Sequence, residues 1–156
     1  MTTVDDIPSI KKLDEATVNK IAAGEIVVSP SAALKEMIEN SIDAGSTSIT
    51  IISQKSGFDY LQIQDDGHGI KKEDFPLLCE RFATSKIQTF GDLRKVRSFG
   101  FRGEALASIS LVSKVTVTSK VRGADIAYIG DFVDGLLIDE DGSGPKAIAA
   151  QEGTTI

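Results

Sequence analysis

Cysteine and histidine occur only once each in this sequence, as Cys79 and His68. A single cysteine excludes an internal disulfide and fits a reducing compartment, and so few soft ligands argue against a zinc site. No apolar run approaches the roughly 20 residues that span a bilayer. The first residues, MTTVDDIPSIKKL, lack the apolar stretch of a secretory signal. We therefore expect a soluble globular protein without membrane contacts.

Positive charge is also scarce. The 156 residues include 17 lysines and arginines against 23 aspartates and glutamates, which gives a net charge of −6. A domain that binds DNA by itself usually carries a basic face, although basic residues do gather between Lys86 and Arg102. We expect weak or no DNA binding by this acidic chain alone. Another part of a larger protein, or a partner, would supply much of any DNA contact.

The length fits one domain, and the hydrophobic patterning indicates both helices and strands. Helices are expected over residues 14–24, 29–44, 71–82 and 103–111. Strands are expected over residues 47–54, 59–65, 114–120 and 125–132, with a further one beginning at residues 153–156. The economical architecture is an α/β (α+β) two-layer sandwich, with helices on one face of a mixed β-sheet.

The second expected helix has clear end signals. Ser29 and Pro30 are a typical N-cap and first helical residue, and Gly45 is typical of a helix end. Four apolar residues recur at helical spacing and should face the core: Leu34, Met37, Ile38 and Ile42.

Polar side chains recur along the same helix, in KEMIENSIDAG. Glu36, Asn40 and Asp43 are spaced i, i+4 and i+7, so they share a face beside the apolar one. A solvated polar stripe would explain this spacing. Asparagine in mid-helix nevertheless invites a specific partner, and a glutamate and an asparagine one turn apart could hold a water and Mg²⁺, which prefers oxygen ligands and substrate phosphates. Both interpretations stay open at this point.

The second motif, DDGHG at 65–69, follows an expected strand directly. It could be an ordinary turn, because Asp and Gly are turn residues. Alternatively, the Asp65 carboxylate could accept a hydrogen bond from an exocyclic amine such as that of adenine. Gly67 and Gly69 would then allow the backbone to approach the ligand closely. The sequence contains neither a G-x-G-x-x-G fingerprint nor a P-loop.

Two further motifs carry phosphate-binding chemistry. ATSK at 83–86 offers hydroxyl groups and an ammonium group, but such tetrapeptides are common. In SFGFRGEALASI at 98–109, glycines flank Arg102 just before an expected helix, so free N–H groups and the helix dipole favour an anion there. A glycine loop that merely caps a helix is the alternative.

The order of these motifs resembles the split ATP site shared by gyrase B, Hsp90, histidine kinases and MutL proteins. Within that superfamily, GFRGEALASIS (100–110) closely resembles the MutL family of DNA mismatch repair proteins. IAAGEIV (21–27), KEMIENSIDAGSTSI (35–49) and RFATSK (81–86) do so too, and the resemblance returns at 153–154. KEDFPLLCERFATSK and AYIGDFVDG look most like the eukaryotic MutL homologue 1 branch. The resemblance implies the Bergerat ATP-binding fold.

The resemblance also implies roles for individual residues. Glu36 would be the general base, Asn40 would coordinate Mg²⁺ between the phosphates, and Asp65 would bind the adenine amine, with Gly67 and Gly69 shaping that pocket. Residues implied to line the phosphates and the lid are Thr84, Ser85, Lys86, Gly100, Phe101, Arg102, Gly103, Glu104, Ala105 and Leu106. Thr154 would lie near the nucleotide. The lid, about residues 85–102, is expected to be mobile without nucleotide and ordered with it.

The implied function is an N-terminal module that binds and hydrolyses ATP in a mismatch repair protein, coupling ATP binding to lid closure and dimerisation. ATP and Mg²⁺ are the expected cofactors. A second MutL-type subunit, MutS-type mismatch-recognition proteins and, through the complete protein, DNA are the expected partners, in the nucleus. Residues 1–156 would form one domain, without the transducer subdomain that supplies a lysine to the γ-phosphate in this family, and would hydrolyse ATP very weakly alone.

Two alternatives stay open. One is a nucleotide-binding module without appreciable turnover in this fragment. The other is another ATPase of the superfamily, of the chaperone or topoisomerase type, against which GFRGEALASIS argues. The sequence also departs from the family at Asp66, where asparagine is usual, and this adds a negative charge near a polyanionic ligand. His68 fills a variable position of the motif and is interpreted as a spectator.

Overall fold

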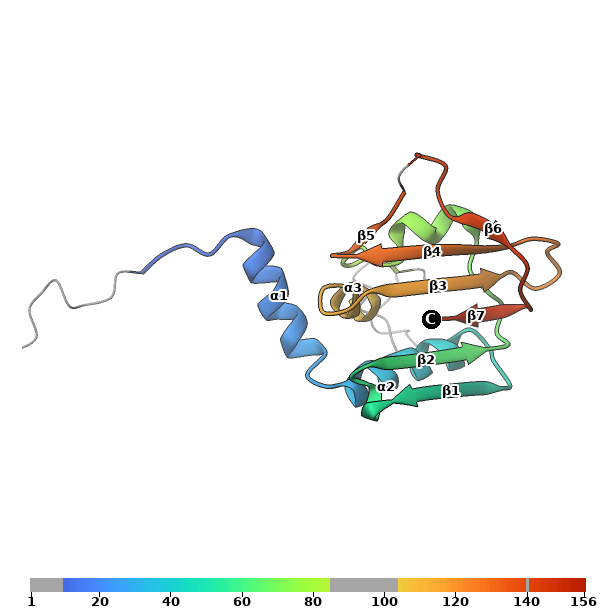
Figure 1. The fold of residues 1–156 in the computed structure, drawn as a ribbon, viewed down its shortest axis with the longest axis horizontal. Helices are drawn as coiled ribbons and strands as arrows, with labels where there is room; N and C mark the ends of the chain where they lie inside the picture. The colour runs from blue at the N-terminus through green and yellow to red at the C-terminus, as the bar shows by residue number, and fades with distance from the viewer. Residues whose placement is uncertain (1–9, 85–103, 140) are drawn as a thin grey trace, which may run out of the picture.

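The computed structural model describes residues 10–84, 104–139 and 141–156, which form two layers (Figure 1). One layer is a seven-stranded sheet in the order β1-β2-β7-β3-β4-β5, with β6 pairing with β4 off that path. The strands are β1 (Ile49–Gln54), β2 (Tyr60–Asp65), β3 (Val115–Lys120), β4 (Ala127–Val133), β5 (Leu136–Leu137), β6 (Lys146–Ile148) and β7 (Gly153–Thr155). The strand that comes last in sequence therefore lies inside the sheet.

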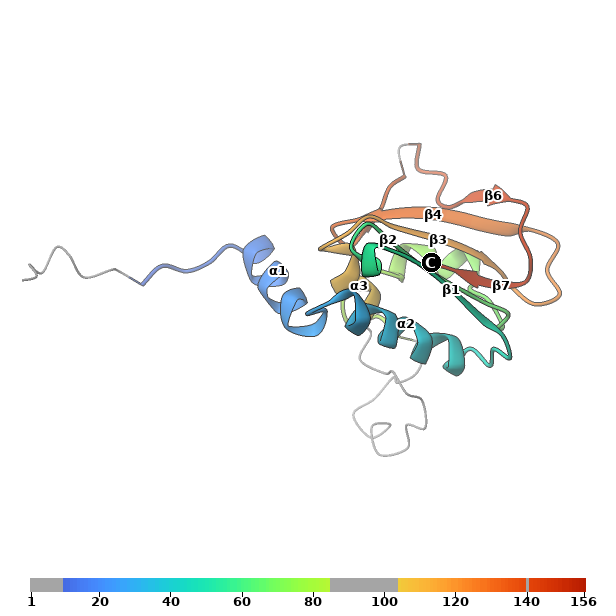
Figure 2. The same cartoon turned by 60° about the horizontal axis from the view of Figure 1, so that its bottom comes forward.

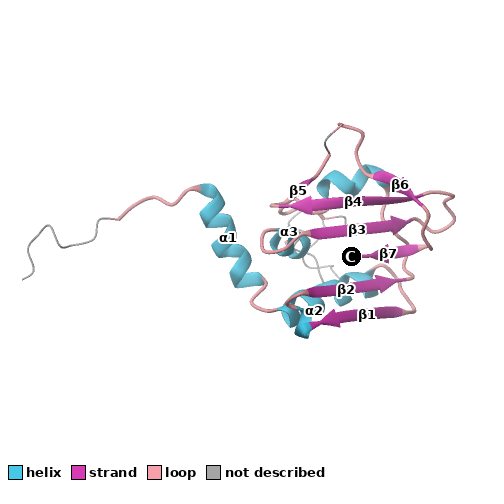
Figure 3. Ribbon diagram, viewed as in Figure 1, coloured by secondary structure: helices cyan, strands magenta, loops and turns pink. Residues whose placement is uncertain are grey.

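The second layer is helical. It contains α2 (Pro30–Asp43), α3 (Ala105–Ser110) and the 3-10 segment η3 (Lys72–Leu77), while η2 (Lys55–Gly57) forms the turn between β1 and β2. Figure 2 shows α2 and α3 on one face of the sheet, and Figure 3 shows α1 (Glu15–Ile26) standing to one side of the body. None of the helices in the described ranges is long and apolar enough to cross a membrane. The predicted two-layer architecture, with helices on one face, is confirmed.

The expectation of a mixed sheet is wrong, because every recorded strand pairing is antiparallel. β2 and β3 do run in the same direction, since both are antiparallel to β7. The segment between them, which includes η3 and α3, is the kind of crossover that joins parallel neighbours. Here β7 lies between β2 and β3 and pairs with both in antiparallel fashion, so β2 and β3 are not direct neighbours in the sheet.

The helix signals in the sequence are largely confirmed. Ser29 caps α2 by accepting a hydrogen bond from the Ala32 N–H at 3.2 Å, and Pro30 occupies its first turn. Gly45, just beyond the end of α2, has a left-handed backbone (φ 72°). By contrast, α1 passes through Gly24 and ends at Ile26, because a glycine ends a helix only where it takes the left-handed conformation.

Other boundaries differ from expectation. The helix expected over 71–82 is instead η3, which contains Pro76; proline lacks the N–H that a longer α-helical ladder would require. The helix expected over 103–111 is the shorter α3. β5 and β6 were not predicted, since two or three residues are too few to show a strand period.

The core lies between the two layers. Its most deeply buried large side chains come from the sheet and from η3: Phe75, Phe132, Ile63 and Val117. Of the α2 residues predicted to face the core, Met37 is buried in it, and Leu34 and Ile38 are partly buried and pack against the core. Ile42 is 44% exposed, so that part of the prediction is wrong. Ile42 lies about 140° around the helix from Met37, near the end of α2, where it is beyond the buried stripe.

Candidate functional site

Three neighbouring strands each place one polar side chain in a single row. Asp65 at the end of β2 is paired with Thr154 of β7, which is paired in turn with Ser119 of β3. These side chains alternate in phase with the buried Ile63 and Val117, so they face the helical layer. All three are buried, with exposed fractions of 8%, 8% and 1%. The sheet thus brings together Asp65 and Thr154, two predicted site residues far apart in sequence.

Asp65 is held by two neutral donors. The Ser41 hydroxyl donates to its Oδ2 at 2.8 Å, and the Gly67 N–H donates to its Oδ1 at 2.9 Å. Each carboxylate oxygen has two acceptor sites, so both retain capacity for a ligand. Ser41 comes from the buried face of α2 and ties that helix to the end of β2. Sequence reasoning missed Ser41, although a serine in phase with buried Met37 was the available signal.

The turn after Asp65 is packed closely on both sides. A Cβ on Gly67 would lie 2.8 Å from the Ala44 Cβ, and one on Gly69 would collide with the backbone oxygen of Lys120. Gly69 also has a left-handed backbone, with φ 77°. These positions require glycine for the fold itself. Gly67 thus lies against Asp65, and Gly69 lies against the end of β3. The part predicted for these two glycines in ligand binding stays a prediction.

Ser119 was not predicted, yet it is the most connected side chain of the row. Its Oγ lies 2.8 Å from the Ile70 nitrogen, 3.0 Å from the Gly153 carbonyl oxygen and 3.0 Å from Thr154 Oγ1. It therefore joins the turn after β2 to β7. The signal in the sequence was VTVTSK, whose alternation puts a polar residue on the face of two buried valines.

Helix α2 carries the other predicted residues of the site. Glu36 and Asn40 are half-buried, one turn apart, and Ser41, next to Asn40, contacts Asp65. With 3.6 residues per turn, Glu36, Asn40 and Asp43 lie along one flank of the buried stripe that contains Met37 and Ser41. The helix therefore presents the Glu36 carboxylate and the Asn40 amide beside its buried face. On that buried face, Ser41 contacts Asp65.

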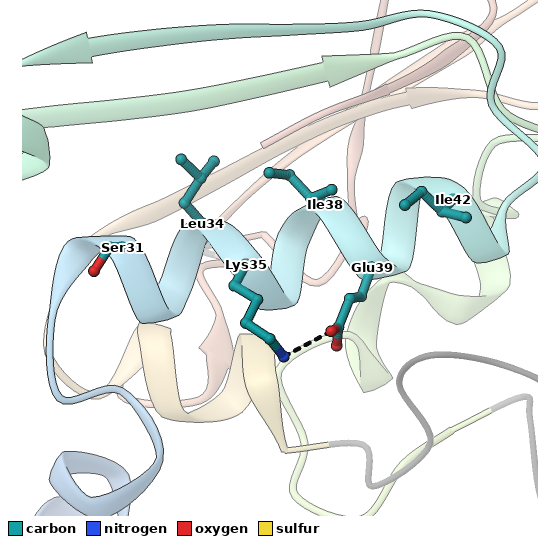
Figure 4. A pocket seen from close by; sticks show the side chains of 6 residues that line it. All are labelled: Ser31, Leu34, Lys35, Ile38, Glu39 and Ile42. Atoms are coloured by element: carbon teal, nitrogen blue, oxygen red, sulfur yellow. Dashed lines mark hydrogen bonds and ion pairs between the residues drawn. The ribbon is translucent and has the colours of Figure 1, made fainter.

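The opposite flank of α2 is an open, mostly apolar groove (Figure 4). It is lined by Ser31, Leu34, Lys35, Ile38, Glu39 and Ile42. Lys35 and Glu39 form an i,i+4 ion pair at 2.6 Å along it. No predicted site residue lines this groove, so it is separate from the candidate site.

The predicted phosphate-binding residues are described only in part. Glu104 immediately precedes α3, and its carboxylate forms an ion pair with Arg81 at 2.9 Å; Arg81 also donates to Asn19 of α1 at 3.0 Å. Thr84, Ala105 and Leu106 are half-buried. The remaining residues predicted for the phosphates lie outside the described residues, as does the predicted lid over 85–102: Ser85, Lys86, Gly100, Phe101, Arg102 and Gly103.

The donor set fits Mg²⁺ only together with a ligand. Across the described ranges, no group of three or more His, Cys, Asp or Glu side chains could hold a metal ion. Mg²⁺ keeps several waters and relies on substrate phosphates, so a single amide oxygen such as that of Asn40 is compatible with it. The residues present would not make a metal site of their own.

The chain matches the sequence pattern of the histidine kinase-, DNA gyrase B- and HSP90-like ATPases over residues 28–133, which is more than half of its length. The chain belongs to this ATPase family. The DNA mismatch repair protein MLH1 of Saccharomyces cerevisiae is 54% identical over 147 residues, which make up 94% of the chain and 19% of the yeast protein. The chain thus spans only about a fifth of that relative's length. Its homologues in this ATPase family are MLH1 and MutL proteins, as predicted.

Solved structures agree with this assignment. The crystal structure of the N-terminal domain of a DNA repair protein superposes with a TM-score of 0.72 at 30% identity, covering 92% of this chain and 40% of that one. The Aquifex aeolicus MutL ATPase domain complexed with ADP gives a TM-score of 0.53 at 26% identity, covering 81% and 40%. The predicted ATPase fold is therefore confirmed.

Asp66, where the family resemblance leads us to expect asparagine, has a local structural role. The Asp66 carboxylate accepts hydrogen bonds from the Thr47 N–H at 2.7 Å, the Thr47 hydroxyl at 2.6 Å and the Ser48 N–H at 2.9 Å. These bonds, the Thr47 hydroxyl first, lower the pKa of Asp66 to about 2 from an ordinary 3.8. Both carboxylate oxygens are engaged by the segment that leads into β1.

These contacts predict an acid-dependent contribution to stability. Because the folded pKa of Asp66 is depressed, its contribution is complete above about pH 4 and is lost as the pH falls towards about 2. Urea unfolding between pH 6 and pH 2 should show a steeper acid loss for the parent than for Asp66→Asn. Thr47→Val, which removes the strongest of the bonds, should reduce the difference. Identical slopes for the parent and Asp66→Asn would contradict this account.

Proposed function

We propose that this chain binds ATP at the row formed by Asp65 and Thr154, and that it is the ATP-binding and ATP-hydrolysing module of a MutL-type DNA mismatch repair protein. Its homology to MLH1 and MutL proteins supports the biological role. The structural similarity to an ADP-bound MutL ATPase domain supports the ligand.

The observation that carries the proposal is a buried carboxylate with neutral partners. Burying a charge is costly unless it is paired, and the bonds recorded for Asp65 come from a hydroxyl and a backbone N–H. Each carboxylate oxygen can accept a second hydrogen bond, so Asp65 can also accept from the N–H groups of a ligand. An adenine amine supplies the N–H donors that this acceptor would need.

The catalytic roles follow from α2. Glu36 would take a proton from the water that attacks the γ-phosphate, and Asn40 would offer its amide oxygen to Mg²⁺. When bound with ATP, Mg²⁺ would neutralise charge on the phosphates. Ser41 holds α2 against the end of β2. This contact fixes the position of Glu36 and Asn40 on the helix relative to Asp65 on the strand.

In the complete protein, we propose that ATP binding drives lid closure and dimerisation with a second MutL-type subunit, within a nuclear heterodimer that works with MutS-type proteins on DNA. The eukaryotic MLH1 relatives support the nuclear location. The net charge of −6 supports weak DNA binding by these residues alone.

The decisive experiment separates binding from turnover. We expect saturable ATP binding by this chain with phosphate release near background, and faster release by a longer chain that includes the second subdomain, because the family resemblance assigns the γ-phosphate lysine to that subdomain. Calorimetric titration and a phosphate-release assay on both chains would test this. Absence of ATP binding would reject the proposed function, and equal turnover by the two chains would place catalysis within these 156 residues.

A further inference from the structure

The buried Ser119 hydroxyl has three hydrogen-bonding neighbours but only one proton to donate. It has one O–H to donate and two lone pairs to accept with. Its neighbours are the Ile70 N–H at 2.8 Å, which can only donate, and the Gly153 carbonyl at 3.0 Å, which can only accept. The third is the Thr154 hydroxyl at 3.0 Å, which can do either.

Only one arrangement satisfies all three contacts. The Ser119 proton goes to the Gly153 oxygen, since that carbonyl has no proton to give. One Ser119 lone pair takes the Ile70 N–H, and the other is left for the Thr154 proton. Thr154 is therefore the donor in its bond with Ser119. Its oxygen then keeps only lone pairs for anything else that approaches.

The consequence reaches Asp65, the neighbour of Thr154 in the row. As a carboxylate, Asp65 also only accepts, and its recorded donors come from Ser41 and Gly67. Because the Thr154 hydroxyl donates its proton to Ser119, Thr154 and Asp65 can both offer only acceptors to a ligand at this site. A row of acceptors favours a ligand group that brings only N–H donors.

We propose that Ser119 is a positioning residue that fixes the Thr154 hydroxyl as an acceptor, and so makes the site select adenine over guanine. This inference rests on the proposed function. Adenine presents an amine, a donor, at the ring position where guanine presents a carbonyl, an acceptor. Guanine would set its carbonyl against acceptors on two sides. Without the Ser119 lone pair, the Thr154 hydroxyl can turn and donate to that carbonyl.

The test is the ratio of GTP to ATP dissociation constants, measured by titration for the parent and for Ser119→Ala. We expect the ratio to fall about two- to tenfold in Ser119→Ala, the range of one neutral hydrogen bond. Ser110→Ala is the matched control, because Ser110 is equally buried (2% exposed) but donates to Ala107 within α3. A general loss of stability would weaken the binding of both GTP and ATP in both variants. Only Ser119→Ala should change the ratio of the two dissociation constants.

A folded Ser119→Ala variant with the parent's ratio would overturn the role of Ser119 and leave the proposed ATP site intact. No saturable ATP binding by the parent would reject the proposed function, and this inference with it. If Ser119→Ala does not fold, Thr154→Val removes the hydroxyl that Ser119 is proposed to orient, at nearly constant volume, with Thr154→Ser as its conservative control. The ratio should then fall in Thr154→Val and persist in Thr154→Ser; an unchanged ratio in Thr154→Val would overturn the proposal.

Discussion

Replacing Glu36 with alanine should abolish ATP hydrolysis in a chain long enough to turn over, while leaving ATP binding largely intact. Removing a general base typically slows a reaction by about 10²–10⁴-fold. Glu36 lies on the flank of α2, half-buried, and Asp65 lies on a different element. Loss of the Glu36 carboxylate should therefore affect the rate of phosphate release and not nucleotide affinity. Single-turnover phosphate release and ATP titration measure the two separately.

Glu39→Ala is the matched control on the same helix. Glu39 faces the open groove and pairs with Lys35, and an exposed i,i+4 pair contributes only about 0.3–0.5 kcal/mol. We expect the parent's rate of hydrolysis from this variant. If Glu36→Ala hydrolysed ATP at the parent's rate, or if both variants slowed equally, Glu36 would lose its assigned role.

Changing Asp65 to asparagine should weaken ATP binding by roughly ten- to a hundredfold. A hydrogen bond to a charged group contributes about 1.5–3 kcal/mol, and an asparagine amide would point an NH₂ group towards the adenine amine or towards Ser41. Only one of the two oxygens that now accept from Ser41 and Gly67 would remain. Calorimetric titration measures the affinity, and thermal unfolding of the same variant shows whether the fold persists.

The adjacent Asp66→Asn variant is the control for charge. Both changes remove one negative charge at neighbouring positions, but the Asp66 carboxylate is bonded to Thr47 and Ser48. Its replacement should leave ATP affinity close to that of the parent. Equal losses in the two variants, or equal parental affinities for ATP and GTP, would argue against Asp65 as the residue that reads adenine.

Local features of the fold were predictable because they depend on neighbours in sequence. The N-cap at Ser29, the strand that ends in Asp65 and the glycine turn after it follow from cap chemistry, alternation and turn propensities. The family resemblance supplied the roles predicted for Glu36 and Asn40, because helical spacing alone left open whether these residues form a solvated stripe or a site.

Long-range features were not predictable in the same way. No local pattern indicates that β7, three residues long, lies between β2 and β3, and the sheet was therefore expected to be mixed. Helical spacing and strand alternation could have indicated that Ser41 and Ser119 face the core. Their contacts with Asp65 and Thr154 depend on tertiary structure and could not be predicted locally.

The central position of β7 has a consequence for synthesis on the ribosome. β1 and β2 form one hairpin and β3 and β4 form another, and each can pair as soon as its residues leave the exit tunnel. Within the described sheet, β7 joins the two hairpins by pairing with Asp65 on one side and Ser119 on the other. Until residues 153–155 emerge, each nascent hairpin keeps an inner edge without a partner. The row of Asp65, Thr154 and Ser119 is thus among the last parts of the sheet to form, so the proposed nucleotide site would be incomplete until β7 has been synthesised.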